Sequence, residues 1–380
     1  MRRFYLCFLL IPAVLLSAST VMNAEEKQTV LEVGTVAKFT LPPGRWYVST
    51  QLGQAFGDRC VIPSHIPGQL GYFLHCYSMS SELLWTITED IGVGHRVGSV
   101  LLAPSDNYAT KRVSLADGSI LWKNESFHFH GQREMPAFET EEGLVFLPGN
   151  RPFVVSKRTG KEIRESSQKI PPVRASFREG DHVWLLTNSG QARKYGDLEL
   201  RKWDLRTLEE KLCVKLLGRQ LIGKLECYNS YRILRSANAV VVLASNCACA
   251  YDISSGKVTS RRTNITLAEN WQAVFDDYVV INGMERRQIK VPYDSEKEVE
   301  ETDLFKGCGG RIADWGLFLY GEVVKRIRDN KLETWGKVGG SESVGGNYSA
   351  YGKQAVAFYP GFDDNQTVFF RELILKKELE

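Results

Sequence analysis

The sequence of 380 residues has little excess of charge of either sign, few histidines and no long hydrophobic run. Its 48 Lys and Arg residues nearly balance 45 Asp and Glu residues, which gives no electrostatic case for binding nucleic acid or an anionic membrane surface. The main apolar stretch, residues 4–16, is shorter than the roughly 20 residues that a membrane-spanning helix needs. We therefore expect no nucleic-acid partner and no integral membrane segment.

The sequence also lacks the familiar signatures of catalytic and phosphate-binding sites. It contains no Gly-x-Ser-x-Gly, His-Glu-x-x-His, Cys-x-x-Cys or phosphate-binding loop. The run Phe127-His128-Phe129-His130 is suggestive, since a strand would place both imidazoles on one face and both phenyl rings on the other. We interpret it as a strand end with its rings turned inward; a metal or acid–base site, with Glu134 as the nearest carboxylate, is the alternative. We predict no metal and assign no catalytic residue.

The N-terminus has the pattern of a secretory signal peptide. Two arginines precede the apolar stretch, and small and polar residues follow it before the first acidic residues. A lipid anchor is not expected, because Cys7 lies inside the apolar stretch and not at its end. We predict a signal peptide over residues 1–24 and a mature chain of residues 25–380 that is secreted or periplasmic.

Seven cysteines remain after the signal peptide, and export makes disulfides their default chemistry. Cys60 and Cys76 flank a segment with prolines and a glycine, so we expect a disulfide between them. A pair between Cys213 and Cys227 is the second expectation, and a nearby Cys-x-Cys leaves other pairings open. In a strand that spacing puts both sulfurs on one face, but a metal site would need more ligands nearby. The disulfide candidates are Cys60, Cys76, Cys213, Cys227, Cys247 and Cys249.

A repeated strand unit organises the chain. From about residue 70 onward, short apolar strands are separated by Gly, Asn, Asp, Ser and Pro, and residues 144–156 and 278–283 read as hairpins. A larger unit then recurs: an alternating strand, a turn with Asp, Ser or Thr before Gly, and a second strand that Trp sometimes closes. Aligned on the glycine of the turn, its copies lie about 42 residues apart on average, at positions 81, 118, 160, 208, 256, 298 and 331.

A strand repeat of this length is typical of β-propellers, in which four-stranded sheets called blades pack face to face around an axis. We therefore predict an all-β fold, a single propeller of seven or eight four-stranded blades after the signal peptide. A blade that joins residues 45–50 to residues 355–375 would close the ring without an exposed sheet edge. A pair of β-sandwiches is the alternative, although it does not require the turn to recur at one interval.

The pattern Asp-x-x-(Ser/Thr)-Gly-Lys-x-x-x-Trp after an alternating strand resembles the blade motif of the PQQ-like β-propellers, also called quinoprotein dehydrogenase-like propellers. The resemblance spans about residues 70–340 and is most specific in two of the copies. Trp85, Trp122 and Trp335 occupy the closing position of the motif. The resemblance implies that these tryptophans pack between neighbouring blades.

That family includes quinoprotein dehydrogenases, the outer-membrane assembly lipoprotein of the β-barrel machinery, and binding or scaffold propellers. The chain has no adjacent Cys-Cys pair of the kind found in the alcohol dehydrogenases of the family, and it is much shorter than those enzymes. We therefore expect an exported, monomeric, non-enzymatic propeller that binds a protein or glycan partner through loops on one face of the ring, without a cofactor. The alternative is an enzyme with its site at the central channel, either a quinoprotein-type oxidoreductase with PQQ and Ca²⁺ or a propeller hydrolase or lyase.

Four Asn-x-Ser/Thr sequons are candidate glycosylation sites if the source of this exported protein is a eukaryote. In a bacterium the same sequons carry no meaning. They lie at Asn124, Asn264, Asn347 and Asn365.

Overall fold

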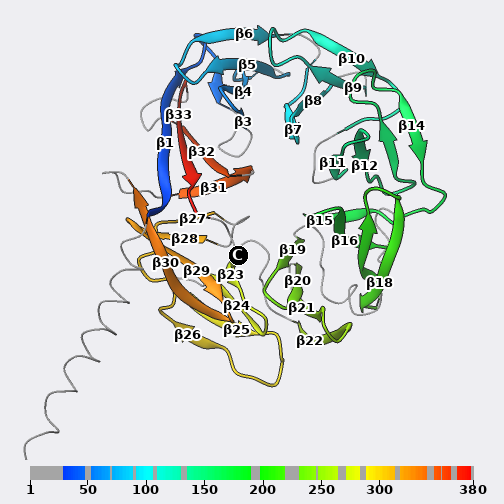
Figure 1. Ribbon diagram of the computed structural model, residues 1–380, viewed down its shortest axis with the longest axis vertical. Coiled ribbons are helices and arrows are strands. Elements are labelled where there is room, and N and C mark those ends of the chain that lie inside the picture. Colours follow the sequence, from blue (N-terminus) through cyan, green and yellow to red (C-terminus); the bar gives the residue numbers. More distant parts are fainter. Residues whose placement is uncertain are drawn as a thin grey trace, which may run out of the picture. The chain divides into compact units, whose positions relative to one another are not determined.

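The computed structural model shows two compact units built from β-strands and turns (Figure 1). Unit 1 comprises Met1–Lys38, Lys306–Tyr359 and Phe369–Glu380, and unit 2 comprises Phe39–Phe305 and Pro360–Val368. The chain is all-β as predicted: no described residue is helical, so none belongs to a helix that could cross a membrane. The described residues are 29–47, 53–68, 71–88, 91–105, 109–129, 135–189, 197–218, 231–244, 247–263, 271–282, 288–312, 317–339, 346–351, 353–360 and 366–377.

Unit 2 contains six antiparallel sheets, here named A to F in chain order, each made of strands that follow one another along the chain. Sheet A consists of β2 (Trp46–Tyr47), β4 (Arg59–His65), β5 (Phe73–Ser78) and β6 (Leu83–Ile87), with β3 (Gln54–Phe56) paired to β4. Sheet B consists of β7 (His95–Val97), β8 (Val100–Pro104), β9 (Thr110–Val113) and β10 (Ile120–Asn124). Sheet C consists of β11 (Ala137–Glu139), β12 (Leu144–Phe146), β13 (Phe153–Val155) and β14 (Glu162–Glu165).

The remaining three sheets of unit 2 have the same four-stranded order. Sheet D consists of β15 (Val173–Glu179), β16 (His182–Asn188), β17 (Leu198–Asp204) and β18 (Glu209–Leu217). Sheet E consists of β19 (Arg232–Arg235), β20 (Ala239–Ala244), β21 (Cys247–Asp252) and β22 (Lys257–Thr263). Sheet F consists of β23 (Trp271–Val274), β24 (Tyr278–Asn282), β25 (Gln288–Pro292) and β26 (Glu300–Thr302).

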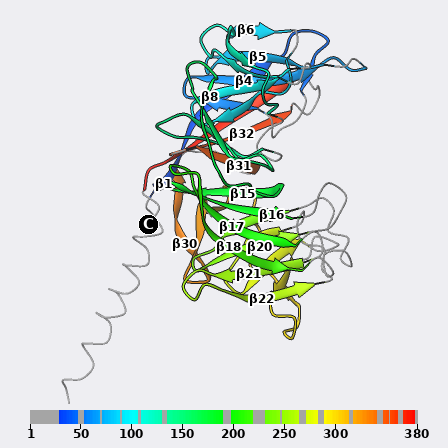
Figure 2. The same cartoon turned by 90° about the vertical axis from the view of Figure 1, so that its right-hand side faces the viewer.

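Neighbouring sheets share cores, because the two faces of a middle strand bury their side chains against different partners. In β21, Cys247 and Cys249 belong to a core shared by sheets D and E, whereas Ala248 and Ala250 belong to a core shared by sheets E and F. Figure 2 shows sheets D and E as successive layers of strands. Each fully buried aliphatic side chain in these cores stabilises the folded state by about 1.5–3 kcal/mol relative to the same side chain exposed to water. Because Cys247 and Cys249 belong to the same core, their sulfurs lie on one face of β21, as the Cys-x-Cys spacing predicted.

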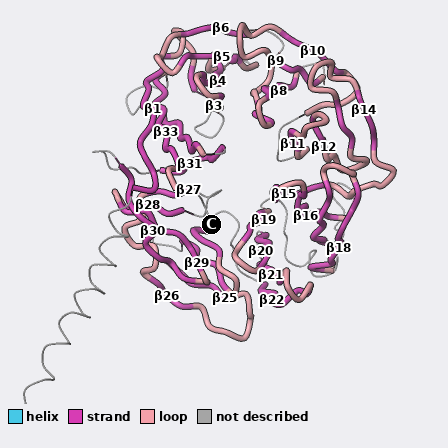
Figure 3. The backbone as a smooth tube through the Cα atoms, viewed as in Figure 1, coloured by secondary structure: helices cyan, strands magenta, loops and turns pink. Residues whose placement is uncertain are grey.

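The predicted repeat matches the sheets almost to the residue. Its turns lie between the third and fourth strands of the sheets, in connections that Figure 3 colours as loops. Five of the seven aligned positions, 81, 118, 160, 208 and 256, have a positive φ. Three of them are glycine, which adopts this conformation without strain. In the corresponding turn of unit 1, between β29 and β30, the positive φ values fall at Asp329 and Asn330, just before the aligned position 331.

A β-bulge follows each of these turns in sheets A to E. One residue of the fourth strand has no partner on the third strand, and such a bulge bends the strand and re-aims the next side chain. The residue after the bulge is the closing position of the sequence repeat. The bulged residues are Leu84, Leu121, Ile163, Lys211 and Thr259.

Unit 1 contains one sheet whose hydrogen-bonded order, β1-β30-β29-β28-β27-β31-β32-β33, closes back on β1. It combines two antiparallel meanders through two parallel pairs, β27 with β31 and β30 with β1. The bounds are β1 (Thr29–Thr40), β27 (Gly310–Ile312), β28 (Leu317–Tyr320), β29 (Val323–Arg328), β30 (Lys331–Gly339), β31 (Gly346–Tyr351), β32 (Gln354–Pro360) and β33 (Thr367–Leu375).

The N-terminal strand that joins the C-terminal strands is β1 and not residues 45–50. The backbone N–H of Lys376 donates to the carbonyl oxygen of Val30 at 2.9 Å, which ties the two ends of the chain together. Trp46 and Tyr47 instead form β2, which pairs with β4 of sheet A. The expectation that strands from both ends share a sheet is thus confirmed, but with a different N-terminal segment; residues 48–50 lie outside the described residues.

The predicted disulfide between Cys60 and Cys76 is wrong. The two residues lie on the paired strands β4 and β5, where Cys76 is opposite Val61 and Cys60 is opposite Tyr77. Because successive side chains of a strand point to opposite faces, the two sulfurs lie on opposite sides of sheet A. The prolines between them did not prevent a regular strand, since Pro63 lies inside β4.

The second predicted disulfide is not formed by the part of the chain that the structure describes. Cys213 is an exposed free thiol on β18, and Cys227 lies outside the described residues. No disulfide joins any of the described cysteines. Cys247 and Cys249 are buried in the core between sheets D and E and pack there as small apolar side chains.

Candidate functional site

Trp85 and Trp122 lie at equivalent places in sheets A and B, directly after the bulge and against the next sheet. The indole N–H of Trp85 donates to the carbonyl oxygen of Leu115 at 3.1 Å, and that of Trp122 donates to Lys157 at 2.9 Å. Each acceptor lies three residues before the glycine of the next turn. A Cβ on Gly160 would lie 2.5 Å from the Trp122 ring, so the glycine allows the ring to rest on the turn.

Arginine supplies the hydrogen-bond donor at two later joins, which the sequence repeat did not reveal. Arg164 follows the bulge of sheet C, and its guanidinium donates to the carbonyl oxygen of Arg206 in the turn of sheet D. Arg262 of sheet E lies two residues after the closing position, Ser260, and donates to the carbonyl oxygens of Asp294 at 2.9 Å and Lys297 at 2.8 Å in the turn of sheet F. A guanidinium has several N–H donors, so it can bind turn carbonyls as the indole does.

The closing positions of sheet D and of unit 1 show no such hydrogen bond in the described part of the chain. Leu212 of sheet D packs into the apolar core between sheets D and E. Trp335 of unit 1 is 5% exposed, and its indole N–H has no hydrogen-bond partner among the described residues. At the tryptophan joins of unit 2 the acceptor lies in a turn that connects two neighbouring strands. The neighbouring strands β33 and β1 of unit 1 come from opposite ends of the chain, so no turn connects them and none can accept the Trp335 N–H.

Phe127 and Phe129 turn their phenyl rings inward, as predicted, although residues 127–129 are not part of a strand. The Phe127 and Phe129 rings lie 4.7 Å and 5.6 Å from the Phe146 ring, in the core between sheets B and C. His128 is half-buried, and His130 and Glu134 lie outside the described residues. Within the described part of the chain, no group of three or more His, Cys, Asp or Glu side chains could hold a metal ion.

The sequons differ in their surroundings. The Asn124 side chain donates to the carbonyl oxygen of Gly160 at 2.7 Å and accepts the backbone N–H of Ser126 at 2.7 Å. A glycan on this amide would have to replace a contact between sheets B and C. Asn347 lies in β31, and Asn264 and Asn365 lie outside the described residues.

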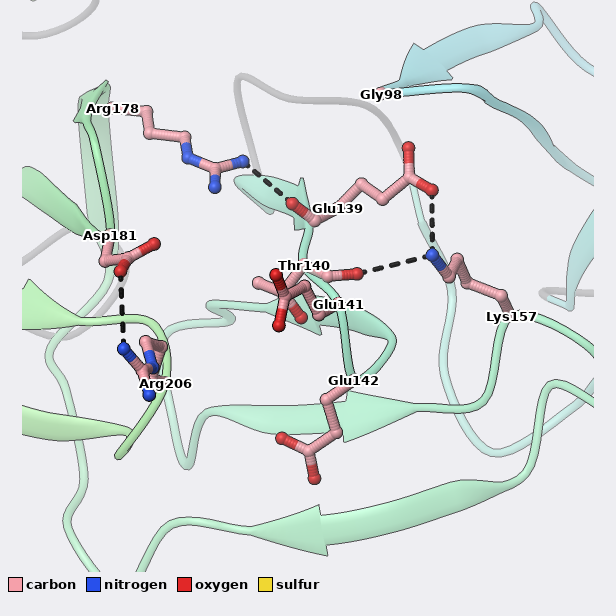
Figure 4. A pocket seen from close by; sticks show the side chains of 9 residues that line it. All are labelled: Gly98, Glu139, Thr140, Glu141, Glu142, Lys157, Arg178, Asp181 and Arg206. Carbon is pink, nitrogen blue, oxygen red and sulfur yellow. Dashed lines mark hydrogen bonds and ion pairs between the residues drawn. The ribbon is translucent and has the colours of Figure 1, made fainter.

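A pocket of about 730 Å³ opens where turns of sheets B, C and D meet. Gly98, Thr140 and Asp181 belong to the turns between the first and second strands, and Lys157 and Arg206 belong to the turns between the third and fourth strands. Figure 4 shows these side chains around one space. Its lining residues are Gly98, Glu139, Thr140, Glu141, Glu142, Lys157, Arg178, Asp181 and Arg206.

The first turn of sheet C shapes this pocket because it is longer than its neighbours. Sheets B and D each use two residues at this place, beginning with Gly98 and Gly180 at a φ of 61°. Sheet C uses four residues, 140–143, between the paired residues Glu139 and Leu144. This longer turn carries two carboxylates, Glu141 and Glu142, that line the pocket. The corresponding turns of sheets B and D are tight and have only two residues.

Glu139 is the most connected acid of the pocket. Its carboxylate accepts hydrogen bonds from the Ser99 backbone N–H at 2.6 Å, the Ser99 hydroxyl at 2.9 Å and the Lys157 ammonium at 3.0 Å. Burial alone would raise the pKa of Glu139, but these hydrogen bonds outweigh burial and hold the pKa below its usual value. Glu139 therefore stays ionised and links sheet B to sheet C.

The other charged groups are paired to different degrees. Glu142 accepts hydrogen bonds from both Nε and Nη2 of Arg164, and this pairing lowers the pKa of Glu142. Arg206 and Asp181 approach only to 3.8 Å, and both are largely exposed. Within the described residues Glu141 makes no hydrogen bond or ion pair, and Figure 4 shows it between the Asp181–Arg206 pair and the Lys157–Glu139 pair.

Sequence reasoning missed this pocket because its residues come from five turns and two adjoining strands of three sheets. The signal that was available is the run Glu139-Thr140-Glu141-Glu142, which stands where sheets B and D have a Gly-Ser or Gly-Asp turn. Without the register of the sheets, such an acidic run reads only as a solvated loop.

No protein-family model and no curated protein sequence matches the chain. Among solved structures it is similar to the crystal structure of BamB from Moraxella catarrhalis, with a TM-score of 0.50 and 11% sequence identity. The similarity covers 90% of this chain and 99% of that chain. It supports the β-propeller fold predicted from the repeat and, at this identity, concerns the fold alone.

Proposed function

We propose that this protein is an exported, non-enzymatic, PQQ-like β-propeller that binds a protein partner through the turns on one face of sheets B, C and D. The observation that carries the proposal is the pocket, where five turns and two adjoining strands bring together seven charged side chains. Small-molecule and cofactor sites are lined mainly by apolar and aromatic side chains, whereas charge complementarity orients protein partners. The lining contains no aromatic side chain, which also favours a protein over a glycan.

The proposal includes an eight-bladed ring. Sheets A to F would supply six blades, β27–β30 a seventh, and β31–β33 with β1 an eighth. The last blade would combine strands from both ends of the chain, which removes the exposed edges of an open array. The protein would act as a monomer outside the cytoplasm after loss of residues 1–24, which lie outside the described residues.

The acids of the pocket support binding rather than catalysis. A general base near neutral pH needs a raised pKa, whereas hydrogen bonds lower the pKa of both Glu139 and Glu142. Their partners hold these carboxylates in place as fixed charges, which suits recognition of a surface of complementary charge.

Site-specific photo-crosslinking in the expression host tests this function. A benzophenone amino acid at Thr140 in the pocket should capture one discrete protein partner. The same amino acid at Ile163, an exposed residue of the outer strand β14, serves as the control and should not capture that partner. Equal capture at both positions, or no capture at Thr140 in its native compartment, would contradict the proposal.

The enzyme alternative has a separate test, thermal unfolding of the purified chain during titration with PQQ and Ca²⁺. We expect no cofactor absorbance and no stabilisation, because binding to the folded state alone would raise the unfolding temperature with ligand concentration. A saturable rise of several degrees would overturn the non-enzymatic function.

A further inference from the structure

The fourth strand of each sheet of unit 2 lies at one end of its sheet order, so one of its edges has no partner strand among the described residues. Figures 1 and 2 show β6 in this outermost place in sheet A. Such an edge presents a row of backbone N–H and C=O groups with which another extended segment can pair. Native proteins commonly prevent this pairing with charged side chains on the edge strand, lysine above all.

Five of the six outer strands of unit 2 carry such charges, and β6 carries none. β10 contains a lysine, β14 and β18 contain acidic and basic residues, β22 contains lysine and arginine, and β26 contains glutamate. In contrast, β6 reads Leu-Leu-Trp-Thr-Ile over residues 83–87. At the bulge itself, sheet D has Lys211 where sheet A has Leu84. The edge of β6 therefore lacks the charges that would hinder pairing.

The exposed side chains of β6 suit an apolar strand beside it. Leu83 is 44% exposed and Leu84 is 39% exposed, although the other side chains of the strand are buried or half-buried. Trp85, the next residue, is buried because the bulge aims it at the turn of sheet B. Two neighbouring aliphatic side chains thus remain in water on an edge that can form backbone hydrogen bonds.

We propose that the free edge of β6 binds an extended segment of a partner protein by strand addition. Main-chain hydrogen bonds supply the affinity, and aliphatic side chains at alternate positions of the segment cover Leu83 and Leu84. Glu82, an exposed acid just before β6, favours a basic residue at the facing end of the segment. Sheet A contributes no residue to the pocket of sheets B, C and D, so this second surface goes beyond the proposed function and does not rest on it.

Two other occupants fit the edge less well. The interior of a lipid bilayer has no donors or acceptors for the backbone groups of an edge strand. A stable dimer of folded copies needs an interface of about 1,200–2,000 Å², far more than a five-residue edge with two exposed leucines offers. A flexible segment needs only the length of the strand and reaches it without docking a whole domain.

The probe is a fluorescein-labelled heptapeptide of alternating valine and threonine with a lysine at one end, titrated into the full chain and followed by fluorescence anisotropy. A matched peptide is N-methylated on its three central residues, so that neither of its edges can donate. We expect saturable binding of the first peptide and binding about tenfold weaker for the second, because side-chain contact alone does not replace the lost backbone hydrogen bonds.

The variant Leu84→Lys should weaken the unmethylated peptide by about fivefold, because it gives β6 the charge that Lys211 gives the bulge of sheet D. Leu121→Lys is the matched control and should leave the affinity unchanged. Leu121 is the bulged residue of β10, it is 49% exposed, and its strand already contains Lys123. In the wild type, peptide binding should slow hydrogen exchange at amides of β6 and not at those of β10. Circular dichroism and thermal unfolding establish that both variants are folded.

Four results would overturn the inference: no saturable binding of the unmethylated peptide, equal affinity of the two peptides, a Leu84→Lys variant that binds as tightly as Leu121→Lys, or unchanged exchange in β6. Sedimentation velocity and binding to phosphatidylcholine–phosphatidylglycerol vesicles test the other occupants. A dimer or vesicle binding that Leu84→Lys abolishes would show that a second copy or lipid covers β6, and would also overturn it. Crosslinking at Thr140 does not involve β6, so failure here leaves the proposed function standing.

Discussion

The joins between sheets A, B and C differ from the later joins of unit 2, although all of them begin after the same turn. The A–B and B–C joins use a tryptophan that both covers a turn and donates to it. The C–D and E–F joins use arginine as the donor, and the D–E join uses leucine in an apolar core. At the A–B, B–C, C–D and D–E joins the common element is the bulge, which aims one side chain at the next sheet, and not the type of that side chain. At the E–F join the donor Arg262 lies three residues after the bulge.

The difference shows that burial of apolar side chains and hydrogen bonding to a turn are alternative ways to stabilise a join between two sheets. Where the closing residue is Leu212, the shared core of sheets D and E includes the large side chains of Trp184 and Tyr251. Where it is arginine, the guanidinium satisfies turn carbonyls that would otherwise be poorly paired. The sheets can therefore be held together by apolar area, by donors, or by tryptophan, which supplies both.

The largest expected effect is that of removing Trp122, which is 7% exposed. We expect Trp122→Ala to lower the free energy of unfolding by about 3–5 kcal/mol, because it removes a buried ring and a hydrogen bond at once. Trp122→Phe keeps part of the ring area and should cost less. Urea unfolding followed by circular dichroism measures both, and a loss below about 1 kcal/mol in Trp122→Ala would show that the join does not depend on tryptophan.

Sheet A should also differ from sheet E in its response to acid. His75 is fully buried between Ser64 Oγ at 2.7 Å and Thr86 Oγ1 at 3.0 Å. Burial, with Arg45 nearby, lowers the pKa of His75 from 6.5 to about 4. Between these values the unfolded chain binds a proton that the folded chain does not, so stability present above pH 6.5 is lost progressively, by about 3 kcal/mol, as the pH falls towards 4.

Unfolding of the wild type and of His75→Gln in urea at several pH values measures this contribution. The wild type should lose stability more steeply than the variant between pH 6.5 and pH 4. Identical slopes would show that His75 titrates normally in the folded chain. Hydrogen exchange at acid pH should then find amides of sheet A opening before those of sheet E.

Two turn glycines with the same φ allow two costs of a Gly→Ala substitution to be measured separately: the strain of a positive φ and the clash with a tryptophan ring. Gly160 and Gly256 both have a φ of 68°. A Cβ on Gly160 would lie 2.5 Å from Trp122, whereas a Cβ on Gly256 would meet only the Tyr251 hydroxyl at 3.8 Å. We expect Gly160→Ala to cost about 2–3 kcal/mol and Gly256→Ala about 1 kcal/mol, measured by urea unfolding. Equal costs would mean that the ring does not press on the turn.

The smallest effect is expected at the arginine join between sheets E and F. Arg262→Met keeps an unbranched side chain but removes the donors to Asp294 and Lys297, so we expect a loss of about 1–2 kcal/mol. Leu212→Met at the apolar join is the contrast, because a swap of similar volume usually costs less than about 1.5 kcal/mol and leaves no carbonyl unpaired. Thermal unfolding should rank Arg262→Met below Leu212→Met in stability; the reverse order would show that the guanidinium contributes little.

Local features of the fold were predictable because they depend on neighbouring residues. The turn positions at 118, 160 and 256 need a positive φ, and glycine marks them directly in the sequence. Ser81 and Leu208 were found only because the spacing of the repeat required a turn there. The Phe127 and Phe129 rings were likewise placed inward by the alternation of apolar and polar residues alone.

Features that depend on pairing between distant segments were not predictable in the same way. Nothing local indicates that β1 pairs with strands more than 300 residues away, or that Gly34 in its middle leaves space for the Glu372 side chain. The face of Cys60 follows from its register against β5, and a shift of one residue would have reversed it. The hydrogen bonds of Arg164 and Arg262 likewise depend on the position of the turn in the next sheet.

The sequence by itself determined the strand content, the interval of the repeat and the place of its turns, because backbone preferences and side-chain alternation act over a few residues. Tertiary structure alone decided which side chain joins each sheet to the next, on which face of sheet A Cys60 and Cys76 lie, and where a pocket opens. These outcomes depend on register and turn length in several sheets at once. The pocket beside Glu141 exists because one turn of sheet C is two residues longer than its counterparts in sheets B and D.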